Sequence, residues 1–189
     1  MACCSAYSKS SSPMGQGKSV ISVPVTLTVS TAANYADGDS CGGLLEFPCA
    51  IGDTSGSATL KQIQLVEKAG TGSALKYAMD LVLLANGNYS IADNAAFVAA
   101  TADLMTDNYI LGHYAIVTGD YFTVGSTTTH AEVMKTSKDF GDWKVYKSGM
   151  VDPASTSSTS VYGYLIWRGG ANDYASGASL KLILTFERD

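Results

Sequence analysis

The segment "ALKYAMDLVLLA" (residues 74–85) alternates apolar and polar side chains in the way expected of a β-strand. One face collects the apolar side chains of Leu75, Tyr77, Met79, Leu81 and Leu83. The opposite face carries Lys76 and Asp80. Because successive side chains of a strand point to opposite sides, this pattern predicts a strand with one buried and one exposed face.

The same pattern returns at short intervals along the chain. Before this segment it occurs in "SVISVPVTLTVS" (19–30), "GLLEFPCAI" (43–51) and "SATLKQIQLVEK" (57–68). Pro24 lacks a backbone N–H, which predicts an edge, a strand start or a bulge at that position. After residue 108 the pattern returns in "YILGHYAIV" (109–117), "DYFTVGS" (120–126), "HAEVMKTS" (130–137), "WKVYKSGMV" (143–151), "SVYGYLIWRG" (160–169) and "ASLKLILTFER" (178–188). Nine or ten short strands at this spacing predict a β-sandwich or barrel.

One stretch departs from the strand pattern. "IADNAAFVAATADLMTDN" (91–108) is rich in alanine, and Asp93 and Asn94 could cap a helix. We therefore expect one or two short helical turns there, between strands. The predicted fold class is all-β.

Composition predicts one globular domain with an extension. The first 18 residues are rich in Ser, Lys and Gly and show no hydrophobic period, so we expect a flexible or extended arm over residues 1–18 and a single β-sandwich domain over residues 19–189. The chain has 17 acidic and 12 basic residues, with the basic ones scattered, which argues against nucleic-acid binding. No apolar run is long enough to span a bilayer and the N-terminus lacks the apolar centre of a secretory signal, so we expect synthesis in the cytoplasm and no membrane partner.

The four cysteines predict no zinc site, because the spacings of Cys3, Cys4, Cys41 and Cys49 do not match those of zinc ligands. A disulfide between Cys41 and Cys49 is possible by their separation, but a reducing compartment argues against it. We expect buried or half-buried free thiols.

The stretch "NYADGDSCGG" (34–43) could be a metal-binding loop, a redox site or a turn. A calcium loop of the EF-hand type needs a different order of acids and glycine, because here Gly38 falls between Asp37 and Asp39. Asp and Gly favour tight turns, so we expect a turn and no metal. The surrounding "AANYADGDSCGGLLEF" (32–47) resembles "GANDYASGASLKLILTF" (170–186), which predicts two similar corners between loop and strand.

The remaining motifs favour no catalytic chemistry. "HAE" (130–132) lacks the cysteine pair of zinc deaminases, so His130 and Glu132 are expected to be a solvated or cross-strand pair. Neither a nucleophile elbow nor a phosphate-binding loop occurs, and we expect no enzymatic activity and no cofactor. Several aromatic residues could form a sugar-binding face, although packing in the core is the favoured interpretation: Trp143, Tyr146, Tyr162, Tyr164 and Trp167.

In order along the chain, four stretches resemble small virion proteins of tailed bacteriophages, β-sandwich proteins that decorate or cement the capsid. These are "ANYADGDSCGGLLEF" (33–47), "GSATLKQIQLVEKAGTGSALKYAMDLVLLANGNYSIADNAAF" (56–97), "ATADLMTDNYILGHYAIVTGDYF" (100–122) and "YGYLIWRGGANDYASGASLKLILTFERD" (162–189). The resemblance covers about Val20 to Asp189 and implies a sandwich of jelly-roll type with no catalytic residues.

The resemblance also implies partners. It suggests a structural protein on the capsid surface that binds the major capsid protein and copies of itself, as a homotrimer. Tyr7, Lys9 and Lys18 of the arm are the candidate partner-binding residues. A carbohydrate- or receptor-binding module of a tail fibre or adaptor is the alternative, and a hydrolase using His113 or His130 is a third hypothesis.

Overall fold

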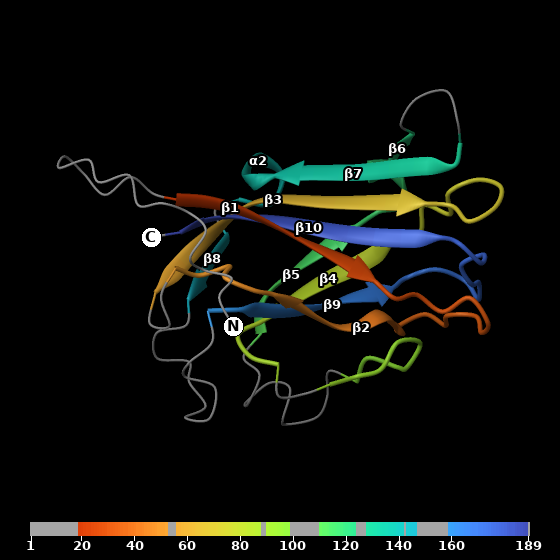
Figure 1. Cartoon of the computed structure of the whole chain (residues 1–189), viewed down its shortest axis with the longest axis horizontal. Helices are drawn as coiled ribbons and strands as arrows, with labels where there is room; N and C mark the ends of the chain where they lie inside the picture. Colours follow the sequence, from red (N-terminus) through yellow and green to blue (C-terminus); the bar gives the residue numbers. More distant parts are fainter. Residues whose placement is uncertain are drawn as a thin grey trace.

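The structure is a computed structural model that describes residues 19–52, 56–87, 90–98, 110–123, 128–141, 143–146 and 159–188. Two antiparallel sheets pack against each other with the main core between them (Figure 1). This is the all-β sandwich of jelly-roll type that the sequence predicted. The proposed arm, with Tyr7, Lys9 and Lys18, lies outside the described residues, as do Cys3 and Cys4.

The larger sheet has six strands in the order β1-β10-β3-β7-β6, and β8 also pairs with β3. Their bounds are β1 (Ser19–Leu27), β3 (Ser57–Lys68), β6 (Phe122–Thr123), β7 (His130–Thr136), β8 (Trp143–Tyr146) and β10 (Ser179–Arg188). Pro24 lies in the edge strand β1, opposite Ile183, so the prediction of an edge position is confirmed. Strands far apart in the sequence are thus neighbours in this sheet.

The smaller sheet has four strands in the order β2-β9-β4-β5. They are β2 (Ser40–Phe47), β4 (Met79–Leu84), β5 (Ile110–Ile116) and β9 (Val161–Trp167). The predicted inward face is confirmed for Met79, Leu81 and Leu83, which are fully buried. The strand begins only at Met79, so Leu75 lies in the preceding connection, where it packs against the core.

The outer face of the smaller sheet carries a second apolar cluster that the alternation did not predict. Val82 and Leu84 are buried there although they point away from the main core, and they cluster with Tyr164, Ile166 and Ile91. Phe97 packs beside Tyr164, with ring centroids 5.2 Å apart. The described segment 90–98 therefore covers this face, and β4 is buried on both sides.

The helical turns expected within residues 91–108 do not form in the part that is described. Asp93 and Asn94 form a turn instead, and Asn94 has a left-handed backbone with φ of 57°. Ala96 then forms a β-bridge with Asp39, because the segment follows the sheet it covers. Residues 99–108 lie outside the described residues. Short helices occur elsewhere, at η1 (Thr118–Asp120) and α2 (Ser137–Phe140).

The two similar corners predicted from the sequence lie side by side. Tyr35 forms a β-bridge with Asn172, and its N–H donates to the carbonyl of that residue at 2.8 Å. Tyr35 and Tyr174, the matching tyrosines of the two stretches, both pack against Trp167. The first corner leads into β2 of the smaller sheet and the second into β10 of the larger sheet, so together they join the two sheets at one end of the sandwich.

The structure describes two of the four cysteines, and the prediction of a free thiol is right for one of them and wrong for the other. Cys41 is a buried free thiol, as expected. Cys49 is disulfide-bonded, so the expected free thiol at that position is wrong, as is the alternative of a Cys41–Cys49 disulfide. Spacing along the sequence and an assumed reducing compartment could not indicate this bond. No helix in the described ranges is long and apolar enough to cross a bilayer.

Candidate functional site

A pocket of about 290 Å³ lies on the outer face of the four-stranded sheet. Its walls combine apolar and charged side chains that come from β4, β5, β9 and three connections. The lining residues are Gly38, Asp80, Val82, Phe97, Ile110, His113, Ile166 and Arg168. The apolar part of the wall continues the cluster that the 90–98 segment covers.

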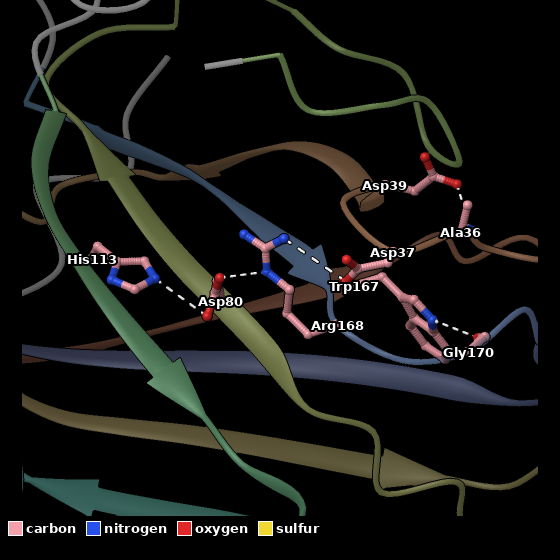
Figure 2. Close-up of polar contacts among 8 residues, drawn as sticks. All are labelled: Ala36, Asp37, Asp39, Asp80, His113, Trp167, Arg168 and Gly170. Atoms are coloured by element: carbon pink, nitrogen blue, oxygen red, sulfur yellow. Dashed lines mark hydrogen bonds and ion pairs between the residues drawn. The ribbon is translucent and has the colours of Figure 1, made fainter. Parts of the chain in front are cut away.

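Asp80 organises the polar end of this pocket (Figure 2). One of its carboxylate oxygens accepts a hydrogen bond from Arg168 Nε at 2.6 Å, and the other lies 3.2 Å from His113 Nε2. The Asp80 side chain is only 14% exposed, whereas His113 and Arg168 are about half exposed. Charge-assisted bonds of this geometry orient both neighbours, so the two basic groups are held at the pocket edge.

The sequence brings these three residues together through register. Val82 pairs with His113 and Asp80 pairs with Ile166, which places the three neighbouring strands in line on one face. Arg168 follows the end of β9, where its backbone N–H donates to the carbonyl of Ala78 at 3.0 Å. Asp80 was predicted to face away from the core, but nothing in the local pattern indicated Arg168 or His113 as its partners.

Chemically, the pocket offers a polar end and an apolar wall. The imidazole could accept or donate a proton, and Asp80 would orient it. Within the described lining there is no hydroxyl or thiol to act as a nucleophile beside it. The arrangement suits binding of a small group with an apolar body and hydrogen-bonding substituents.

The "DGD" stretch forms the predicted turn. Asp39 Oδ2 accepts a hydrogen bond from the N–H of Ala36 at 2.7 Å, and Gly38 has a φ of 91°. Figure 2 shows Asp39 turned toward Ala36, and Asp37 on the side of Arg168, whose Nη1 lies 3.8 Å away. The prediction of a turn is confirmed by this geometry. No group of three or more potential metal ligands occurs among the described residues.

The second predicted histidine lies elsewhere. His130 begins β7, and its Nδ1 lies 3.1 Å from the hydroxyl of Thr129. Glu132 accepts a hydrogen bond from Gln64 Nε2 at 2.9 Å across the sheet, which agrees with the predicted cross-strand role. The structure therefore separates His130 from His113, and only the latter lines the pocket.

The aromatic residues mostly belong to the core, as favoured. Tyr164 and Trp167 are fully buried, and Trp167 Nε1 donates to the carbonyl of Gly170 at 3.1 Å. Trp143 packs against the core and donates to the carbonyl of Leu111 at 3.0 Å. Tyr162 packs against the second cluster. These contacts leave no continuous aromatic face among these four described side chains, and the side chain of Tyr146 lies outside the described part of the structure.

Glu67 is a buried carboxylate that the sequence did not predict. Glu67 continues the inward series of Ile63 and Leu65 on β3 and is fully buried. Its two oxygens accept hydrogen bonds from the backbone N–H groups of Leu75 and Lys76, so it holds the connection before β4. Burial raises the pKa of this carboxyl, against the lowering effect of those bonds.

Large apolar side chains are exposed along the strands at one side of the sandwich. Ile110 is the first residue of the edge strand β5, and Val117 directly follows that strand. Phe122 lies on β6, the edge strand of the other sheet. Val117 is 52% and Phe122 is 46% exposed. We call these three residues the edge surface. Val20 is also exposed, at 57%, but it lies on β1 at the opposite edge of the larger sheet.

Comparison with known protein families and with curated proteins finds no match to the sequence. Among solved structures, a chain from Desmodium yellow mottle tymovirus is 15% identical with a TM-score of 0.29, covering 97% of this chain and 94% of that one. A chain from turnip yellow mosaic virus is 12% identical with a TM-score of 0.26, covering 90% of this chain and 92% of that one. A chain from mud crab tombus-like virus is 12% identical with a TM-score of 0.28, covering 94% of each chain.

Proposed function

We propose that this protein is a structural component of a virion, a decoration protein that stabilises a bacteriophage capsid by binding the major capsid protein and copies of itself. The observation that carries the proposal is the edge surface, where Ile110, Val117 and Phe122 expose apolar side chains beside two edge strands. Edge strands offer unpaired backbone groups, and exposed apolar side chains add area to bury, so a partner protein could use both.

One further point supports this proposal. The order of the sequence motifs resembles that of phage decoration proteins over nearly the whole chain. We propose a homotrimer on the capsid surface, as the resemblance implies, with residues 1–18 as an arm. Tyr7, Lys9 and Lys18 of that arm would add contacts to the capsid protein, and the arm would add avidity to the edge surface.

The test is binding to particles that lack the protein. We expect the purified protein to copurify with such particles and to raise the temperature at which they release their genome. Val117→Asp should abolish binding, because it would bury an unpaired charge in the contact. Val20→Asp is the matched control, since it adds the same charge at an exposed valine on the opposite edge. Absence from purified virions, or equal binding by both variants, would refute the proposal.

A carbohydrate-binding module is the second candidate, and the pocket favours it. Asp80, His113 and Arg168 present hydrogen-bonding groups next to the ring of Phe97, a combination that can bind a sugar hydroxyl and its apolar face. Binding on a glycan array that is lost in Asp80→Ala would support this candidate. Asp37→Ala is the control, because Asp37 is 70% exposed and only peripheral to Arg168. No binding to any glycan would reject it.

A further inference from the structure

The outer face of the larger sheet presents three adjacent strands, β10, β3 and β7, whose outward side chains form rows. Register places Lys181, Val66 and Glu132 in one row, in the order β10-β3-β7. These are the outward positions, because their neighbours along each strand, such as Leu182, Leu65 and Val133, are fully buried.

The next two rows repeat the arrangement with uncharged residues. Ile183, Gln64 and Met134 form the second row, and Met134 is 47% exposed. Thr185, Gln62 and Thr136 form the third row. In each row the residue on β10 and the residue on β7 are of matching kind: opposite charges in the first, apolar side chains in the second and threonines in the third.

A fourth row beyond a β-bulge follows the same rule. Glu187 on β10 and Lys144 on β8 flank Thr59 of β3. The signs of the charges are reversed relative to the first row, so β10 has a cation at one end and an anion at the other. Lys144 lies on the far side of β3 from Glu187, which also pairs with Lys61 at 3.7 Å within the subunit, so the charge match that needs a second copy is that of the first row.

This pattern has a geometric meaning. Consider a twofold axis that lies on this face and runs parallel to β3. Rotation about it generates a second copy facing the first, in which each residue stays at the height of its row while the β10 and β7 sides are exchanged. Two copies packed face to face would therefore place Lys181 opposite the partner's Glu132, and Ile183 opposite the partner's Met134. Within one subunit Lys181 and Glu132 are separated by two strand spacings, about 10 Å, so the pairing is better satisfied between copies.

We propose that two copies of this chain pack through the β10-β3-β7 face about a twofold axis parallel to β3. Sheets that pack face to face keep their strands within about 30° of each other, and the axis along β3 meets that requirement. A twofold contact is self-complementary, which the four rows are. The contact goes beyond the proposed function and uses residues other than the edge surface, so a capsid contact or a trimer contact there could coexist with it.

Charge reversal provides the first test, with sedimentation velocity over a concentration series as the measurement. Lys181→Glu alone and Glu132→Lys alone should each raise the dissociation constant of the twofold contact at least about tenfold, because each brings like charges together. The double variant Lys181→Glu/Glu132→Lys should restore association. Lys138→Glu, in α2 and outside the three strands, changes the net charge by the same amount as Lys181→Glu. This control variant should associate as the parent does.

Cross-linking provides the second test and needs no reversal of charge. Gln64 lies near the proposed axis, so Gln64→Cys should form a disulfide with its own copy under mild oxidation. Thr26→Cys is the control, because Thr26 lies on β1, two strands from the axis. Both variants keep the native cysteines. The proposal is overturned if the parent stays monomeric, if it forms a trimer indifferent to the reversals, if the double variant fails to recover, or if both cysteine variants cross-link equally.

Discussion

The ring of Tyr35 stacks on that of Trp167, with centroids 5.1 Å apart and planes 22° apart. Its hydroxyl accepts the N–H of Ser30 and donates to Asp93 Oδ1, both at 2.6 Å. The same Asp93 oxygen accepts the N–H of Gly42 at 2.6 Å. The Tyr35 hydroxyl thus links the first corner to Asp93 of the 90–98 segment, which covers the smaller sheet. Tyr174, its counterpart in the second corner, has a buried hydroxyl with no hydrogen-bond partner among the described residues.

This difference predicts opposite effects for the same substitution. Tyr35→Phe should lower the free energy of unfolding by about 1–3 kcal/mol, because it leaves buried partners unsatisfied. Tyr174→Phe should be neutral or stabilising, since the hydroxyl it removes is itself unsatisfied. Urea denaturation of both variants measures the two effects. Equal losses would contradict the hydrogen-bond assignment.

Buried phenols predict a loss of stability at alkaline pH. Burial raises the pKa of Tyr35, Tyr121 and Tyr174, and it raises the pKa of the Cys41 thiol to about 12. In the unfolded chain the phenols ionise near pH 10, so above that pH the unfolded state holds fewer protons than the folded one. The loss of stability therefore begins at about pH 8.5, where the unfolded Cys41 thiol ionises, and the phenols add to it above about pH 10. It should amount to roughly 1.4 kcal/mol per pH unit for each group between its unfolded and folded pKa.

Absorbance of ionised tyrosine measures this directly. In the folded protein a fraction of the tyrosines should resist titration until the chain unfolds, and then ionise together with the loss of near-ultraviolet circular dichroism. Complete ionisation of a protein that stays folded would show that these phenols are accessible.

Glu67 predicts a pH effect in the acid range. Its pKa is raised in the folded state by burial, so its favourable contribution is present below the unfolded value and is lost as pH rises through the folded value. Glu67→Gln removes the titration and retains an acceptor for one of the two N–H groups. The stability of this variant relative to the parent should therefore improve from acid to neutral pH. Denaturant midpoints across that range provide the measurement, and a constant difference would contradict the prediction.

Gly112 is predicted to be essential for packing. A Cβ at this position would lie 2.0 Å from the indole of Trp143, too close for any side chain. Gly112→Ala should therefore cost about 1–3 kcal/mol, as the indole or the strand must move. Gly119→Ala is the control, because nothing lies within 4 Å of a Cβ there. Thermal denaturation should separate the two variants, and similar midpoints would exclude the clash.

Much of the fold could be predicted because alternation is local information. The twelve residues of "SATLKQIQLVEK" form β3 over the predicted range, and the buried face of β4 follows the predicted series from Met79. The outer cluster could not be predicted in this way. Val82 and Leu84 are buried only because a separate segment covers them, and alternation says nothing about which segments meet.

The candidate site shows the same limit. The outward position of Asp80 followed from its place between apolar neighbours, but its side chain is only 14% exposed, and its bonds to His113 and Arg168 depend on the register of three strands. Nothing in the sequence singles out Glu67, and only the fold shows that this carboxylate is fully buried. The spacing of the cysteines did not indicate the disulfide at Cys49 either.

The position of β10 between β1 and β3 has a consequence for biosynthesis. Among the described strands of the larger sheet β1 pairs only with β10, so Ser19–Leu27 has no described strand partner in this sheet until Ser179–Arg188 has left the ribosome. β10 must then insert between β1 and β3 after the other strands of the sheet have been synthesised. Until that moment nascent chains expose two unpaired strand edges, so we expect them to depend on chaperones and to be prone to aggregation on crowded polysomes.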